Sequence, residues 1–432
     1  MIPTELENLS YLLNFPDKWE TKTVKSLCLK TTSGGTPSRK NPDFYKNGNI
    51  IWLKTKELKE WYIKDSEEKI TEEALAKSSA KLFPKNTILM AMYGDGRTIT
   101  SLGILRKSAA TNQACCALIP NPEIINFIYL FYLLKFHKEH LIKLALGGAQ
   151  RNLSVKIISD FKVKVSPLST QQKIAGILSA YDDLIENNTR RIEILEEMAR
   201  MLYREWFVKF RFPGHEAVQF VESELGLIPE GWEVVKIENF GKVITGKTPS
   251  KTKPEYYGSY MPFIKTPSMH GKMFCIEVEE YLSKEGADSQ RHKSLPPNTL
   301  IVNCIGALAG SVSITSEFSQ TNQQINAVIL NNIKNREFLY FLLVELKETI
   351  RQYGSTGATM INLSKGKFES LSVLSPNRII LNQFNQLTAS KFELIKNLQL
   401  KNINLRKTRD LLLPRLISGE IDVENLAINT GI

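Results

Sequence analysis

Residues 241–248 match the phosphate-binding pattern GxxxxGK(S/T) at every position, so nucleotide chemistry is the first possibility that the sequence raises. Where this pattern binds phosphate, the loop opens a helix whose amino terminus faces the anion. Here Pro249 and Pro254 follow Thr248 within six residues, and a proline disfavours helical backbone at the residue before it. We therefore predict a polar turn that does not cradle a nucleotide. A nucleotide hydrolase that uses Lys247 and Thr248 stays an alternative.

No other motif for catalysis or metal binding is complete. Residues 41–44 (Asn-Pro-Asp-Phe) resemble the adenine-methyltransferase motif, but its second proline is missing and no glycine-rich cofactor loop accompanies them. The histidines lack metal-ligand spacing, and the cysteines form no CxxC pair, so we expect surface or packing histidines and reduced, packed cysteines. These residues are His137, His140, His215, His270 and His292, and Cys28, Cys115, Cys116, Cys275 and Cys304. The sequence predicts no catalytic centre and no metal site.

Polar turns that carry hydroxyls, amides and cations are the remaining candidates, and their chemistry suits DNA. Hydroxyl and cationic side chains bind phosphate oxygens, whereas Arg, Gln and Asn can make two hydrogen bonds to the edge of a G or an A. The candidate DNA-binding residues are Thr36, Ser38, Arg39, Lys40, Lys54, Lys56, Tyr93, Arg97, Gln150, Arg151, Lys247, Thr248, Ser250, Lys251, Lys265 and Thr359. The alternative for each loop is a solvated turn whose charges only increase solubility.

These turns occur in two copies of one domain. Trp19-Glu20 recurs as Trp232-Glu233, and residues 152–154 (Asn-Leu-Ser) recur at 362–364. Between them, further matches keep their order, and the offset drifts only from 213 to 210. The triplet Thr-Asn-Gln occurs in both copies, at 111–113 and 321–323, before an apolar run. We expect these triplets to make buried hydrogen bonds and not to contact DNA.

The sequence pattern of each copy is typical of an α+β domain. Short apolar runs, rich in β-branched residues and bounded by Gly, Pro and Asn, predict strands in a mixed, partly antiparallel sheet. The predicted strands are 50–53, 87–92 and 115–119, then 263–265, 299–303 and 325–330. A helix-like stretch follows the strands of each copy, at 124–144 and 336–352.

A long helix with an apolar heptad seam follows each copy. The first seam runs from Ile174 to Trp206 and predicts a helix roughly 48 Å long. The second, looser seam runs from Phe384 to Leu412 and is expected to end at Pro414. Asn188 and Asn402 occupy seam positions, where a polar residue can fix register and partner. Two seams in one chain most simply pair as an antiparallel coiled coil.

The predicted organisation is α+β, with two repeated α/β domains separated by two long helices. The segments are 1–166 (first repeated domain), 167–212 (central helical spacer), 213–376 (second repeated domain) and 377–432 (carboxyl-terminal helical spacer). Their net charges are +9, 0, −1 and +3, and the total of +11 favours a polyanionic partner. The longest nearly apolar stretch, 124–134, is too short to cross a bilayer, and Glu5 and Glu7 stand where a secretory signal needs cations. We therefore expect a cytoplasmic protein with no membrane partner.

Four segments resemble the specificity subunit of type I restriction-modification enzymes. The clearest is the carboxyl-terminal stretch 405–421 (LRKTRDLLLPRLISGEI), and the others are 171–175 (QQKIA), 202–210 (LYREWFVKF) and 228–233 (IPEGWE). The resemblance extends over essentially the whole chain, because the order of repeats and helices also matches that family.

The resemblance implies a non-catalytic subunit that binds double-stranded DNA. In that family each globule, here 1–166 and 213–376, is a target recognition domain that reads one half of a split, asymmetric target, and the helices hold two modification (methyltransferase) subunits. Those partners would carry S-adenosylmethionine, and a restriction (endonuclease and translocase) subunit would use ATP and magnesium. A coiled-coil scaffold that binds only proteins remains an alternative from a different class.

Overall fold

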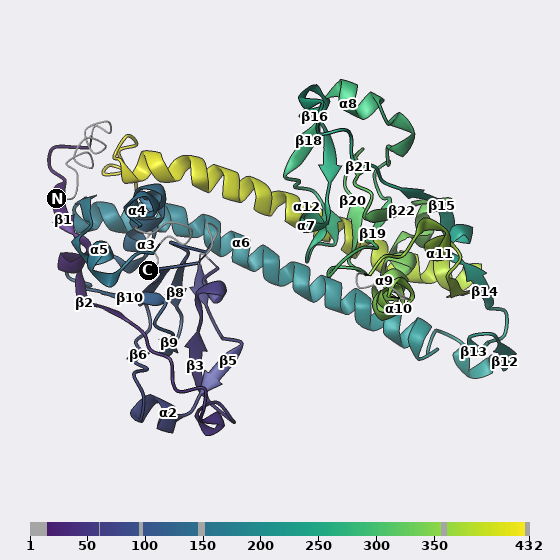
Figure 1. The fold of residues 1–432 in the computed structure, drawn as a ribbon, viewed down its shortest axis with the longest axis horizontal. Helices are drawn as coiled ribbons and strands as arrows, with labels where there is room; N and C mark the ends of the chain where they lie inside the picture. The colour runs from purple at the N-terminus through teal and green to yellow at the C-terminus, as the bar shows by residue number, and fades with distance from the viewer. Residues whose placement is uncertain (1–14, 60, 95–97, 146–151, 356–360, 428–432) are drawn as a thin grey trace. The chain divides into compact units, whose positions relative to one another are not determined.

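The computed structural model describes residues 15–59, 61–94, 98–145, 152–355 and 361–427 (Figure 1). The chain divides into two compact units, and each contains one sequence repeat. Unit 1 comprises the chain up to Ile185 and from Leu405 onward, and unit 2 comprises Glu186–Asn404. Each long helix therefore contributes one part to each unit. The four-segment division predicted from the sequence stays a prediction.

Unit 1 is built on a five-stranded sheet, and a four-stranded and a two-stranded sheet complete it. The five-stranded sheet has the order β2 (Cys28–Ser33), β10 (Cys115–Pro120), β7 (Ile88–Ala91), β8 (Leu102–Leu105) and β4 (Tyr62–Ile63). The four-stranded sheet has the order β5 (Glu68–Ile70), β3 (Ile50–Leu53), β9 (Ala109–Thr111) and β6 (Leu82–Phe83), and β1 (Glu20–Thr23) pairs with β11 (Lys162–Val165). Two pairs, β4 with β8 and β3 with β9, are parallel, and the others are antiparallel.

Unit 2 repeats the main sheet of unit 1 strand for strand. Its order is β15 (Gly241–Thr245), β22 (Ile325–Leu330), β19 (Leu300–Asn303), β20 (Val312–Thr315) and β17 (Phe274–Cys275). A three-stranded sheet has the order β18 (Glu280–Leu282), β16 (Tyr257–Ile264) and β21 (Gln320–Thr321). Two further pairs are β14 (Glu233–Lys236) with β23 (Ser372–Ser375) and β12 (Phe220–Ser223) with β13 (Gly226–Pro229). The predicted mixed, partly antiparallel sheet is confirmed in both repeats.

The helix-like stretch of each repeat is two helices and not one. The pairs are α3 (Phe127–Phe136) with α4 (Lys138–Leu144), and α9 (Arg336–Glu345) with α10 (Lys347–Gly354). Asn126 caps α3, because its side chain accepts hydrogen bonds from the amides of Ile128 and Tyr129. The other short α-helices of the described residues are α2 (Glu72–Ala76), α5 (Val155–Asp160), α7 (Thr266–Met269), α8 (Lys284–Asp288) and α11 (Lys365–Glu369).

The predicted long helices are α6 (Leu168–Tyr203) and α12 (Arg378–Ile417). In unit 2, Asn188 Nδ2 on α6 donates to Asn402 Oδ1 on α12 at 2.9 Å, as expected for two seam positions. Farther along, the ring of Tyr203, the last residue of α6, lies 6.3 Å from the Phe384 ring on α12. Because the α12 number falls as the α6 number rises, the helices pack antiparallel there.

The expectation that Pro414 ends the second helix is wrong, because α12 continues to Ile417. Proline removes one backbone donor, and in a last turn that loss breaks a single hydrogen bond. The Pro414 carbonyl still accepts from the Ser418 amide at 2.9 Å. Leu413, Leu416 and Ile417 are buried in the core of unit 1, so apolar packing holds this turn in place.

Each unit has one main core that joins its sheet to its parts of the long helices. In unit 1, Tyr129 and Phe131 of α3 are buried together with Leu178 of α6 and Leu416 of α12. In unit 2, Phe338 and Phe341 of α9 surround Tyr203 of α6. Among the described residues, no helix combines the length and apolar character of a membrane span.

Candidate nucleic-acid interface

The first candidate turn follows β2 in unit 1 and packs on the Thr-Asn-Gln triplet. The Gly35 amide donates to the Thr111 carbonyl at 2.8 Å, and the Thr36 hydroxyl bonds the side-chain oxygen of Gln113. A Cβ atom on Gly34 would lie 2.2 Å from the Thr111 carbonyl oxygen, so only glycine permits this approach.

Two aromatic residues fix the other side of the same turn. The indole nitrogen of Trp52 donates to the Gly35 carbonyl at 3.0 Å. The hydroxyl of Tyr45 donates to the Pro37 carbonyl at 2.7 Å. The backbone of the turn is thus held by β3, by the triplet and by the segment around Tyr45.

Unit 2 builds the same turn from the equivalent residues. The Thr248 hydroxyl bonds the side-chain oxygen of Gln323 at 2.6 Å, and the Tyr257 hydroxyl donates to the Pro249 carbonyl at 3.0 Å. A Cβ atom on Gly246 would lie 2.2 Å from the Asn322 carbonyl oxygen. Gly246 belongs to the apparent phosphate-binding pattern, but it is a glycine here because two backbone segments approach too closely for a side chain.

The expectation of buried triplets is correct for their threonines and wrong for their glutamines. Thr111 and Thr321 are fully buried, whereas Gln113 and Gln323 are exposed and bond the turn threonines. Each glutamine belongs to the polar surface of its turn. The sequence contains one sign of this contact between glutamine and threonine. The triplet and the threonine-proline turn both recur, in the same order, in the two copies.

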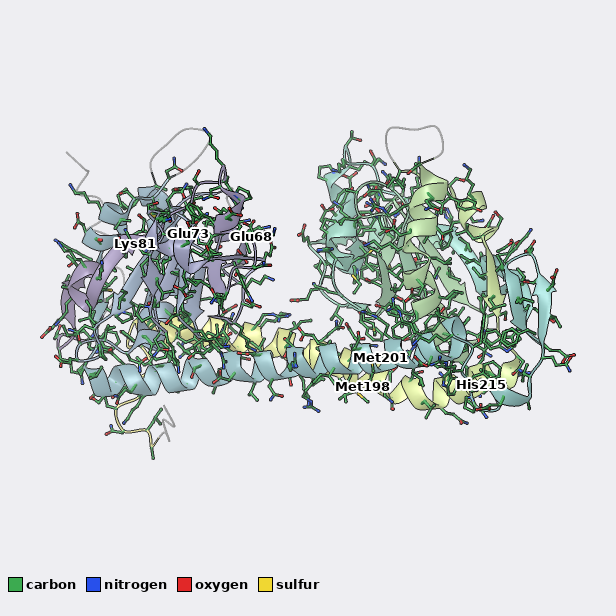
Figure 2. All side chains as sticks on the ribbon, turned by 90° about the horizontal axis from the view of Figure 1, so that it is seen from below. Glu68, Glu73, Lys81, Met198, Met201 and His215 are labelled. Carbon is green, nitrogen blue, oxygen red and sulfur yellow. The ribbon has the colours of Figure 1, made fainter. Side chains whose placement is uncertain are left out.

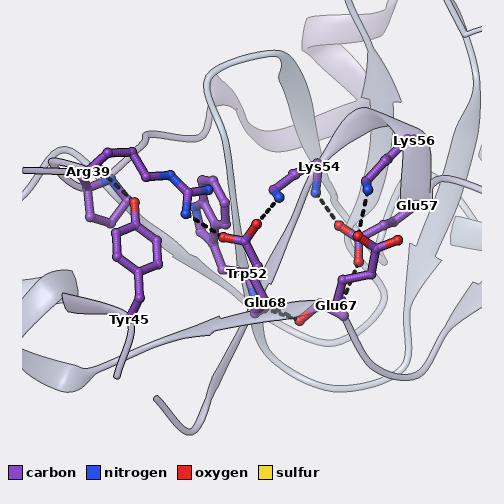
Figure 3. Close-up of polar contacts among 10 residues, drawn as sticks. Arg39, Tyr45, Trp52, Lys54, Lys56, Glu57, Glu67 and Glu68 are labelled. Carbon is purple, nitrogen blue, oxygen red and sulfur yellow. Dashed lines mark hydrogen bonds and ion pairs between the residues drawn. The ribbon is translucent and has the colours of Figure 1, made fainter. Parts of the chain in front are cut away.

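Arg39 leaves the turn of unit 1 and is held over aromatic rings (Figure 3). Its guanidinium carbon lies 4.3 Å from the centre of the Tyr45 ring and 5.1 Å from that of Trp52. Its NH1 nitrogen lies 2.6 Å from the Glu68 carboxylate, whose other oxygen pairs with Lys54. Hydrogen bonding to Arg39, opposed by a smaller effect of burial, lowers the pKa of Glu68.

A second carboxylate fixes the backbone that carries Lys54. Glu57 is buried, and it accepts the Lys54 amide at 2.8 Å and the Glu67 amide at 2.7 Å. Lys56 pairs with Glu67 at 2.6 Å, and both side chains are exposed. Lys54 and Lys56, which we predicted as DNA contacts from their charge, are therefore each paired with a carboxylate (Figure 3).

Unit 2 has the same lysine–glutamate pair at this site but different exposed side chains. Lys265 pairs with Glu280, as Lys54 does with Glu68 in unit 1. Phe263 replaces Trp52, and Lys251 replaces Arg39 in the aligned turn. The Lys251 side chain is exposed and forms no ion pair with any described residue.

The structure brings several predicted residues together and leaves others apart. Thr36, Arg39 and Lys54 share the site of unit 1, and Thr248 and Lys265 share that of unit 2. Ser38, Lys40, Lys247, Ser250 and Lys251 are exposed on the same turns.

Tyr93 is half-buried and bridges to Asn152, which joins two of the candidate loops of unit 1. Arg97, Gln150, Arg151 and Thr359 lie outside the described residues. Charge and hydrogen-bonding type alone did not single out Tyr45, Glu68, Gln113 or Gln323.

Where the structure describes the chain, no three His, Cys, Asp or Glu side chains are grouped so that they could hold a metal ion. The imidazoles of His137 and His140 approach to 3.2 Å between their Nδ1 atoms. Burial lowers the pKa of His137 to about 3, so this imidazole is neutral at physiological pH. It packs between the rings of Phe136 and Phe161 in unit 1.

Comparisons with known proteins agree with the repeated architecture. A family model described as "Type I restriction modification DNA specificity domain" matches the chain twice, at residues 16–197 and 229–404. The chain is 31% identical over 364 residues to the HindI specificity subunit of Haemophilus influenzae, covering 70% of this chain and 79% of that protein. It is 30% identical over 420 residues to the MjaIX specificity subunit of Methanocaldococcus jannaschii, covering 95% of each. A type I restriction-modification S subunit from M. genitalium shares the fold, with a TM-score of 0.59 at 15% identity over 93% of this chain and 96% of that one.

Proposed function

This chain belongs to the family of type I restriction-modification specificity subunits, and from that premise we propose that each of its two units reads one half of a split DNA target. The observation that carries the proposal is the pair of equivalent turns. Both are held by the same threonine–glutamine and tyrosine–carbonyl hydrogen bonds, but their exposed side chains differ. Because these hydrogen bonds are the same, each turn has an equivalent position relative to the sheet of its own unit. Because the exposed side chains differ, for example Arg39 in unit 1 where unit 2 has Lys251, the two units would prefer different half-sites, and we expect an asymmetric target.

The turns offer groups for both kinds of DNA contact. Exposed cations such as Lys40, Lys247 and Lys251 suit phosphate oxygens and would set the position of the duplex. The paired glutamine and threonine, Gln113 with Thr36 and Gln323 with Thr248, offer amide and hydroxyl groups at a fixed position. Such groups can bond base edges or phosphate oxygens.

The long helices offer a surface for partner subunits. Met198 and Met201 on α6 are 49% and 54% exposed, and both are labelled in Figure 2. In unit 1, Leu411 on α12 is 72% exposed. We propose that two modification subunits bind these helices and that restriction subunits join the complex. S-adenosylmethionine, ATP and magnesium would be bound by those partners, while this chain supplies recognition in the cytoplasm, where host DNA is accessible.

Co-expression with the modification subunit of the same system tests the proposal. Methylated adenines mapped across the host genome should fall in one bipartite, asymmetric sequence. Adenine methylation by the purified chain alone would contradict a recognition role without chemistry. Assembly with the modification subunit but no retention of any specific duplex would instead favour the protein-binding scaffold.

A further inference from the structure

Arg39 is the most strongly oriented of the exposed candidate side chains described in unit 1. Tyr45 and Trp52 lie beneath its guanidinium, and Glu68 binds one end of it (Figure 3). The side chain is nevertheless 51% exposed, so a ligand can reach it. Because the side chain is already held in one orientation in the free protein, binding DNA would cost it less conformational entropy.

The contacts of Arg39 leave one edge of the guanidinium available. Glu68 binds NH1, whereas Nε and NH2 donate to no residue that the structure describes. The Nε and NH2 groups present two parallel N–H donors in a fixed fork. A guanine presents two acceptors, O6 and N7, in the major groove, and this fork fits them.

We infer that Arg39 reads a guanine in the half-site of unit 1, and that Glu68 and Trp52 are the positioning residues that aim it. This inference rests on the proposed function. A phosphate contact fits the arrangement less well, because the Glu68 carboxylate beside the guanidinium repels a phosphate. The edge of a neutral base carries no net charge and does not meet that repulsion. Figure 2 labels Glu68 in unit 1, and its side chain is 30% exposed.

The second repeat provides an internal comparison. Its aligned residue is Lys251, and its equivalent carboxylate, Glu280, pairs with Lys265. Lysine is a flexible point charge without a planar fork, so it would hold guanine O6 and N7 in a less fixed geometry than arginine does. We therefore assign Lys251 to the phosphate backbone and Arg39 to a base. The two units then differ in specificity at equivalent positions of one frame.

The test uses the full chain in complex with its modification subunit and compares Arg39→Lys with the unmodified chain. Lysine keeps the positive charge, so a role in phosphate binding would survive the substitution. We expect the methylated sequence to lose its preference for guanine at one position of one half, by roughly tenfold or more. The other half should keep every base preference. Equal loss of methylation at all sequences, or an unchanged motif, would overturn the assignment.

Glu68→Gln tests the positioning role, with Glu67→Gln as its matched control. Each substitution removes one negative charge from adjacent residues, but only Glu68 contacts Arg39. Glu68→Gln should weaken the guanine preference while binding to non-target duplex stays equal or rises. Glu67→Gln should raise non-target binding similarly and leave the preference intact. Loss of the preference in both variants, or in neither, would refute a positioning role for Glu68.

These results separate the inference from the proposed function. If the unmodified complex methylates no bipartite sequence, the proposed function itself fails. If it does so and Arg39→Lys keeps the same motif, only the assignment of Arg39 fails. Thermal melting of each variant checks that the fold is retained before the motifs are compared.

Discussion

Arg409 on α12 forms an ion pair with Asp182 on α6 inside unit 1, and both side chains are buried. The hydroxyl of Tyr132 on α3 donates to the other oxygen of the same carboxylate. Burial raises the pKa of Asp182, and the charge of Arg409 opposes that effect. One carboxylate thus connects the helix of the first repeat with both long helices.

Removing one partner of this pair should destabilise the protein strongly. Asp182→Ala leaves the Arg409 charge buried without its main partner, and we expect a loss of about 3–5 kcal/mol in the free energy of unfolding. The exposed pair of Arg190 and Glu193 is the control, and Glu193→Ala should cost less than about 1 kcal/mol. Urea denaturation of the three proteins measures the difference. Equal costs for both variants would show that the buried pair does not hold unit 1 together.

The stability of unit 2 should depend on pH through Glu196 on α6. Burial is the main cause that raises the pKa of Glu196 to about 7 from 4.5. The folded state therefore holds a proton that the unfolded state releases, so stability is lost as pH rises from about 4.5 to 7. Glu196→Gln removes this loss, and we expect a gain of about 1–2 kcal/mol at pH 8 relative to the effect at pH 5. Thermal unfolding at both pH values measures it.

Glu193→Gln is the matched control for that experiment, because Glu193 lies one turn away on α6 and is largely exposed. It removes only the smaller repulsion that Glu193 exerts on Glu196 and keeps the Glu196 carboxyl, so its effect should depend on pH less than that of Glu196→Gln. A pH-independent effect of Glu196→Gln would show that its carboxyl titrates alike in the folded and unfolded protein.

The length of α6 should set the spacing between the half-sites. The helix begins in unit 1 and continues into unit 2, so a four-residue insertion after Ile185 lengthens it by about 6 Å and turns its far end by about 40°. A matching insertion after Asn404 keeps the antiparallel partner α12 in register. With base pairs about 3.4 Å apart, the methylated target should gain one or two base pairs between unchanged halves. A folded variant that keeps the original spacing would show that these helices do not measure DNA.

Much of the fold follows from the sequence, because its determinants are local. The strands β3 and β22 have the predicted bounds, since short apolar runs between turn residues leave little freedom of assignment. The seam positions of Asn188 and Asn402 were predicted because heptad spacing puts each on the packed face of its own helix, and the structure shows that the two side chains meet. The break between α3 and α4 at His137 was missed, since apolar residues continue on both sides of it.

The candidate site was less predictable, because its geometry depends on residues distant in the sequence. Lys54 and Arg39 looked like free cations, yet one carboxylate from the start of β5 binds both. Which carboxylate reaches a given cation is set by sheet packing and not by spacing along the chain. The Thr36 to Gln113 bond spans 77 residues for the same reason.

The most direct test of two independently reading units is a replacement of one of them. Residues 17–166 are exchanged for the corresponding repeat of a relative, and methylated adenines are mapped in a host that expresses the chimaera with the modification subunit. One half of the target should change to that of the relative, and the other half should stay the same. A target altered in both halves, or in neither, would contradict the assignment of one half-site to each unit.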